Sequence, residues 1–150
     1  MSVVSVVKGN NPEAMLKKAV EWLGGLNPYV KQSQKIFIKP NVCGGIPGKP
    51  GSFTSPRVLE SMIKLLREMD LEVWVGEADS CMYTADVMLS ETGIGAAAMR
   101  SGAKVVNLSH DEIVKVDVSD GYILKSLSVN KAVADADVII SLSLIHISEP

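Results

Sequence analysis

Cysteine and histidine are scarce in this sequence, which holds two of each among 150 residues. Cys43 and Cys81 are too few for a disulfide framework, and too few within this chain for an iron–sulfur cluster or a structural zinc site. Such a pair is typical of buried thiols in a reducing cytoplasm, which is the location we expect. His110, expected on the surface, and His146 stand in no order with serine or cysteine that is typical of nucleophilic catalysis. Neither residue type identifies a reaction.

Charge of one sign and long apolar runs are also missing. The 15 basic and 17 acidic residues give a formal net charge of −2. No basic field therefore indicates nucleic acid, and no basic cluster indicates a membrane surface. No apolar run approaches the roughly 18 residues of a membrane-spanning helix. Residues 1–8 lack the basic region and long apolar stretch of a signal peptide, and their valines predict a first buried strand at residues 2–7.

What the sequence does contain is strand alternating with helix, at a length and an apolar content of 47% that suit one globular domain. Apolar residues at helical spacing, such as Trp22 and Met62, are expected in the core. The alternation occurs four times and is typical of an α/β fold with a mostly parallel sheet and helices on both faces. The expected strands are residues 2–7, 36–38, 71–75 and 104–108.

The rhythm changes after the fourth strand. Residues 113–118 and 122–129 alternate apolar and polar side chains around the tripeptide Ser119-Asp120-Gly121. Asp-Gly between two alternating runs predicts an antiparallel hairpin, which would be a half-exposed insertion on the sheet. A helical turn at residues 131–136 and a last buried strand at residues 137–140 are expected to follow.

Residues 35–56 have the features of a ligand site. An apolar strand ends at Lys39-Pro40-Asn41, and a glycine- and proline-rich loop follows at residues 44–51. Lys39 supplies a positive charge, and Asn41 supplies hydrogen-bond donors and an acceptor. In a parallel sheet, ligands bind where a strand passes through such a loop into a helix.

The helix after this loop adds to the same prediction. Thr54 and Ser55 precede it, Ser55 can cap it, and the start of a helix favours anions. We therefore expect a small anionic ligand here. The loop is neither a Walker A loop nor a Rossmann glycine motif. A plain surface crossover loop is the alternative interpretation.

Acidic side chains end the next expected strand, at Glu77, Asp79 and Ser80. If this strand neighbours the one that ends at Lys39, these groups face the same crevice as Lys39 and Asn41. Two carboxylates beside a lysine can hold a hard cation or act as base and acid. They can equally form a salt-bridged, solvated strand end. A metal site needs further ligands from elsewhere, so the catalytic residues and the metal stay open.

Four segments of the chain resemble the domain-of-unknown-function 362 family: residues 36–41, 54–56, 75–80 and 134–142. The resemblance implies an uncharacterised prokaryotic α/β protein, and it names no reaction or cofactor. Longer members often carry a ferredoxin-type iron–sulfur segment, which is absent from these residues. On the positions that match the family, the candidate site consists of Lys39, Asn41, Thr54, Glu77 and Asp79.

The last residues depart from this family. Members typically continue after the last strand with Pro-Lys-x-Lys-x-His, whereas residues 143–150 read Ser-Leu-Ile-His-Ile-Ser-Glu-Pro. That tail resembles translated adapter or vector DNA, so we expect an incomplete α/β domain at residues 1–142 and a non-native tail from about Leu142. A genuine divergent C-terminus is the alternative. A truncated domain would leave an open sheet edge through which chains can associate.

Three hypotheses of function follow, and whether the protein is an enzyme stays open. The first is the amino-terminal part of a redox- or metal-associated protein that binds an anionic small ligand where the second and third expected strands end. The second is a non-catalytic binding or scaffold domain that partners another chain through its open edge. The third is an incomplete product without activity.

Overall fold

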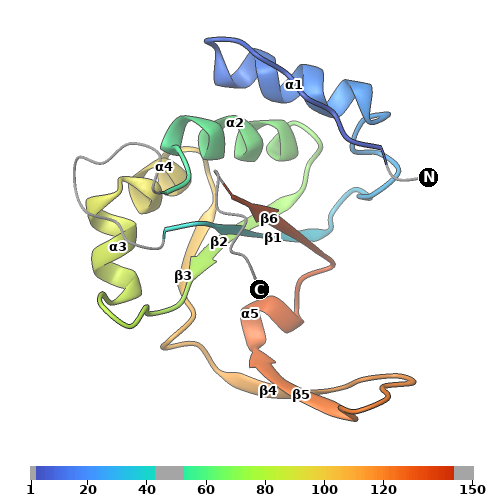
Figure 1. The fold of residues 1–150 in the computed structure, drawn as a ribbon, viewed down its shortest axis with the longest axis vertical. Coiled ribbons are helices and arrows are strands. Elements are labelled where there is room, and N and C mark those ends of the chain that lie inside the picture. Colours follow the sequence, from blue (N-terminus) through green and yellow to red (C-terminus); the bar gives the residue numbers. More distant parts are fainter. Residues whose placement is uncertain (1–2, 43–52, 144–150) are drawn as a thin grey trace.

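A parallel sheet forms the centre of the protein (Figure 1). The computed structural model describes residues 3–42 and 53–143. Four strands in this part of the chain form the sheet, in the order β3-β2-β1-β6. The predicted α/β fold with a mostly parallel sheet is confirmed. The strands are β1 (Lys35–Pro40), β2 (Glu72–Glu77), β3 (Lys104–Asn107) and β6 (Val138–Leu142).

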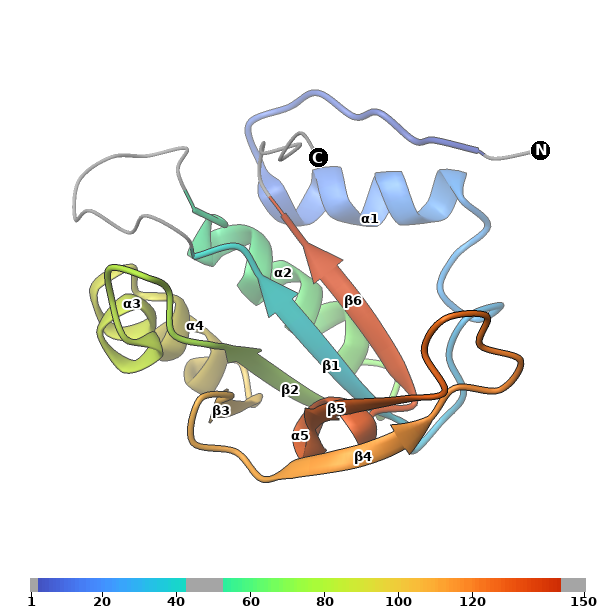
Figure 2. The same ribbon diagram turned by 60° about the horizontal axis from the view of Figure 1, so that its bottom comes forward.

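The helices lie on two sides of this sheet (Figures 1 and 2). The single-turn helix α5 (Lys131–Ala134) lies on the side opposite α1 and α2. Pro12 and Pro56 occupy the first turns of α1 and α2, and the Asn11 side chain accepts a hydrogen bond from Ala14 N at 3.2 Å. The other helices are α1 (Pro12–Trp22), α2 (Pro56–Arg67), α3 (Ala85–Glu91) and α4 (Ile94–Arg100).

The core lies between the sheet and α2. One face of the sheet contributes alternate residues of β1 and β2, because successive side chains of a strand point to opposite faces. The apolar residues predicted on α2 face them and are buried, including Met62. The side chains at 0% exposure in this layer are Ile36, Ile38, Leu59, Ile63, Leu66 and Val75.

Gly76 lies within β2 because the neighbouring strand leaves no room for a side chain. A Cβ atom there would come within 2.7 Å of the Phe37 ring and 3.0 Å of the carbonyl oxygen of Val106. Phe37 is itself 1% exposed. The absence of a side chain at Gly76 thus leaves room for the Phe37 ring beside β2.

The predicted hairpin is confirmed, although its second strand is shorter than expected. β4 (Ile113–Asp117) pairs antiparallel with β5 (Ser126–Asn130). Residues 122–125, expected in the second strand, belong to the connecting loop, where Tyr122 is 96% exposed. Asp120 adopts a positive φ of 57°, so the Asp-Gly turn is present but opens into a wider loop.

The prediction of a strand at residues 2–7 is wrong for the described residues 3–7, which adopt neither strand nor helix. They run over α1 (Figure 2). Trp22, predicted in the core, is 55% exposed, and Lys18 Nζ lies 5.0 Å from the centre of its ring. The exposure of Trp22 follows from the packing of α1, which contacts chiefly α2 and has no buried residue.

In the described ranges, no helix is long and apolar enough to cross a bilayer. Cys43, the loop at residues 44–51, and His146 in the tail lie outside the described residues.

Candidate functional site

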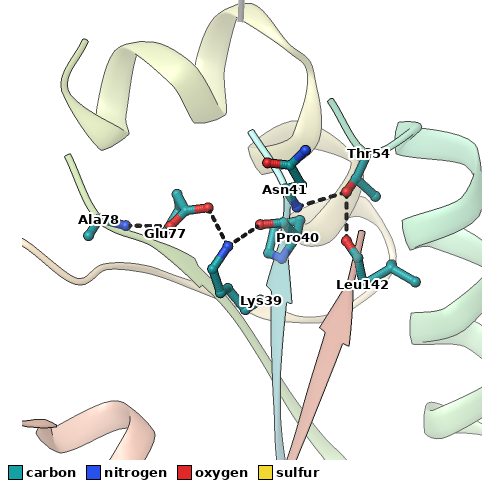
Figure 3. A network of polar contacts seen from close by, with 7 residues as sticks. All are labelled: Lys39, Pro40, Asn41, Thr54, Glu77, Ala78 and Leu142. Carbon is teal, nitrogen blue, oxygen red and sulfur yellow. Dashed lines mark hydrogen bonds and ion pairs between the residues drawn. The ribbon is translucent and has the colours of Figure 1, made fainter. Parts of the chain in front are cut away.

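The site begins where β1 and β2 end side by side. These two strands pair in parallel, with Ile38 opposite Val75, so their carboxyl ends reach the same edge of the sheet. Lys39 Nζ donates to Glu77 Oε2 at 3.1 Å and to the carbonyl oxygen of Pro40 at 3.2 Å (Figure 3). The predicted proximity of Lys39 and Glu77 is therefore confirmed.

The two partners differ in their access to solvent. The side chain of Lys39 is 48% exposed, whereas that of Glu77 is 14% exposed. Glu77 Oε1 also accepts a hydrogen bond from Ala78 N at 3.0 Å, so both oxygens of this carboxylate are engaged. Glu77 is thus a fixed acceptor that holds the Lys39 ammonium at the rim of the sheet, with part of the lysine open to solvent.

Thr54 joins three segments that are distant in sequence (Figure 3). Its Oγ1 donates to the carbonyl oxygen of Leu142 at 2.7 Å and accepts from Asn41 N at 2.8 Å. Thr54 N also donates to the carbonyl oxygen of Asn41 at 2.7 Å, and the residue is 0% exposed. The hydroxyl therefore fixes the start of α2 against the ends of β1 and β6.

Ser55 and Asn41 take their places around this junction. Ser55 occupies the N-cap position of α2 with an extended backbone, but its side chain makes no capping hydrogen bond, so that part of the prediction is wrong. Asn41 is half-buried, and its backbone is held by Thr54 and by the carbonyl oxygen of Leu142, 3.2 Å from Asn41 N. The start of α2 is thereby brought to the strand end that carries Lys39.

Asp79 and Ser80 organise the loop that leads from β2 into α3. Asp79 Oδ1 accepts from Ala85 N, the first residue of α3, at 2.7 Å. Asp79 N donates to Ser109 Oγ at 2.8 Å. Ser80 Oγ accepts from Tyr83 N at 3.0 Å and donates to the carbonyl oxygen of Tyr83 at 3.1 Å. The bonds of the Asp79 and Ser80 side chains are local structure, as expected for short polar side chains before a helix, whereas the bond to Ser109 ties this loop to the residues after β3.

The metal hypothesis gains no third ligand from the described residues. No group of three or more histidine, cysteine, aspartate or glutamate side chains there lies close enough to hold an ion. Glu77 and Asp79 are therefore two carboxylates with no third such ligand among the described residues, whereas hard cations are bound by larger sets of oxygen ligands. Cys81, expected to be buried, is exposed and free. His110 is exposed, as expected.

Sequence reasoning missed the backbone atoms of this site. The carbonyl oxygens of Pro40 and Leu142 and the N–H of Ala78 complete the network, yet any residue type supplies such groups. The only signal available was position, because all three follow or end a strand. Pairing of β1 with both β2 and β6 brings them together.

A family model described as "Domain of unknown function (DUF362)" matches residues 36–146, which run from β1 through β6. The chain therefore belongs to this family. No curated protein and no solved structure matches it.

Proposed function

We propose that this member of the DUF362 family binds a small anionic ligand at the corner formed by Lys39 and the start of α2. The observation that carries the proposal is the Lys39 ammonium, held by Glu77 at 3.1 Å at the carboxyl edge of the sheet and 48% exposed. Ligands of open parallel sheets bind at this edge.

The donors at this corner suit an anion. An ammonium group has three N–H donors, and the described residues engage two of those of Lys39. The twelve-residue helix α2 starts close to the same strand end because Thr54 is bonded to Asn41. The first N–H groups of a helix have no partner within it and favour negative charge.

Glu77 competes with an anionic ligand for the Lys39 ammonium group. Its carboxylate neutralises the lysine in the free protein, so an anion must share or replace that contact. A ligand with two or more anionic oxygens, such as a phosphate group, is better suited than a halide because it can accept from Lys39 and from backbone N–H groups together. On this proposal, the redox or metal association that the family resemblance implies would involve a substrate that carries a phosphate group or a bound metal ion.

The test is calorimetric titration of inorganic phosphate, pyrophosphate and Mg²⁺ into the wild type and Lys39→Ala. We expect Lys39→Ala to weaken anion binding about tenfold or more, the effect of losing one charge-assisted hydrogen bond. Lys115→Ala in β4 is the matched control, because it removes the same charge from the exposed hairpin. Equal binding by wild type and Lys39→Ala would remove Lys39 from the site.

Glu77→Gln sharpens the same test. The substitution keeps the shape of the side chain and removes its charge, so the ammonium loses its competitor. We expect the affinity for phosphate to rise. A fall in affinity with unchanged folding would show that Glu77 is needed to position Lys39, and would contradict the competition.

A second candidate is a non-catalytic scaffold that pairs with another chain through β6. The specific observation is that β6 is an edge strand among the described residues and carries Ile139 at 56% exposure. Exposed strand edges are templates for pairing. Size-exclusion chromatography separates the candidates, because an oligomer that forms with rising concentration and ignores Glu77→Gln supports the scaffold.

A further inference from the structure

We propose that the outer edge of β6 is the docking place of residues 3–7 of the same chain, which add to the sheet as a fifth, parallel strand. In the structure these residues run over α1 without forming a strand (Figure 2). The inference concerns the edge of β6 that faces away from β1, and it does not depend on the proposed ligand.

The handedness of the connections selects this edge. From β1 the chain passes through α2 to β2 and then through α3 and α4 to β3, each step leading away from β6. The helices α1 and α2 lie on the same side of the sheet (Figures 1 and 2). A parallel crossover through α1 into β1 is right-handed only if its first strand lies on the β6 side of β1, and crossovers are almost always right-handed. The place beside β1 is taken by β6, so among residues 3–42 and 53–143 the open place is the far side of β6.

The sequence of residues 3–7 suits a strand at this edge, whereas in the structure most of its valines are exposed and its polar groups lack partners among the described residues. It reads Val-Val-Ser-Val-Val, with valines on both alternating faces, as in a parallel strand covered on both sides. Val3, Val4 and Val6 are 72%, 81% and 79% exposed. Within the described part of the chain, the backbone of residues 3–9 makes no hydrogen bond, and the buried Oγ of Ser5 has no partner.

The edge itself presents matching groups. The carbonyl oxygen of Leu142 in β6 accepts from Asn41 N, the residue after β1, at 3.2 Å. Because strand residues alternate in direction, Leu142, Ile140 and Val138 face β1, and the N–H groups of Ile139 and Ser141 point toward the outer edge. Ile139 is 56% exposed, and α1, which lies outside α2, has no buried residue. A strand on this edge would cover the exposed side chain of Ile139 and would give α1 a surface to pack against.

The segment can reach this edge without unfolding α1. The helix begins near the end of the sheet to which β1 and β6 point (Figure 2), which is where a parallel strand would end. Residues 8–11 link the segment to α1, and four residues span up to about 13 Å. Gly9 lies in this link. Docking in this way would remove the surface on which the scaffold candidate depends.

The test is hydrogen exchange of the Ile139 and Ser141 amides, measured by NMR on the full chain. Ser5→Pro and Val4→Pro are compared with the wild type, because proline cannot donate to a strand. Neighbouring strand residues direct their N–H groups to opposite sides, so only one of the two prolines removes a bond to β6. We expect slow exchange in the wild type and about tenfold or more faster exchange in that one variant, as for a strand that opens locally.

The other outcomes overturn the proposal. Rapid exchange of both amides in the wild type, or rates that neither proline changes, would show that residues 3–7 do not pair with β6. Protection that appears only as the protein dimerises would assign the edge to a second copy. Unchanged exchange of the buried β1 amide of Phe37 confirms in each variant that the fold is intact.

Discussion

The sheet beneath α2 and the hairpin β4–β5 have similar apolar patterns, but they differ in how far their apolar side chains are buried. Val75 in the sheet is 0% exposed, whereas Val116 and Leu127 in the hairpin are 40% and 44% exposed. The strand β2 has a neighbour on each side and α2 across one face, whereas the hairpin is a separate two-stranded sheet. Apolar alternation identifies strands in both regions, but burial depends on what covers them.

The largest effect is expected in the α2 layer. Ile63→Ala removes a side chain that is 0% exposed between α2 and the sheet. We expect the free energy of unfolding in urea to fall by about 3 kcal/mol, from lost transfer energy and the cavity left behind. A loss below about 1 kcal/mol would show that this layer collapses freely onto the gap and is not close-packed.

A smaller loss is expected where the sheet is joined to α2. Thr54→Val keeps the volume of the side chain and removes the donor to Leu142 and the acceptor for Asn41 N. We expect a loss of about 2 kcal/mol, since two hydrogen bonds of a buried hydroxyl are lost and Asn41 N keeps only its longer bond of 3.2 Å to the Leu142 carbonyl oxygen. Thr84→Val is the matched control, because Thr84 Oγ1 accepts one long capping bond of 3.5 Å, worth less than about 1 kcal/mol. Equal effects of the two substitutions would contradict a special role for Thr54.

The candidate site should contribute little to stability. Lys39→Ala removes an ion pair whose lysine is 48% exposed, and such pairs are worth about 0–1 kcal/mol. Urea unfolding should therefore change by less than about 1 kcal/mol, which leaves the titrations interpretable. A loss above about 2 kcal/mol would mean that Lys39 is a structural residue.

The smallest effect is expected in the hairpin. Val116→Ala should change the free energy of unfolding by no more than about 0.5 kcal/mol, as for other exposed positions. Val75→Ala is the same substitution at a buried strand position and should cost about 2 kcal/mol, at roughly 0.8 kcal/mol for each buried CH₂ or CH₃ group. Similar losses at the two positions would show that the hairpin is covered in solution, for instance by another chain.

The differences between prediction and structure fall where long-range partners decide. Met62 and Trp22 both recur at helical spacing, yet Met62 is 7% and Trp22 55% exposed. Helical spacing shows which residues share a face but not whether a second surface meets that face. Likewise, the valines of residues 3–7 predict a strand, but a strand forms only where an edge pairs with it.

The alternation of apolar runs by itself determined the α/β class, the strands of the sheet and the buried face of α2, because these depend on the periodicity of neighbouring residues. The polar residues after two successive strands also placed Lys39 and Glu77 as candidates, since successive parallel strands usually lie close together. Only the tertiary structure decided that Thr54 bonds to Leu142, 88 residues away, and that Asp79 N bonds to Ser109, 30 residues away. Those contacts depend on the strand order β3-β2-β1-β6, and strand order arises from packing across the whole domain.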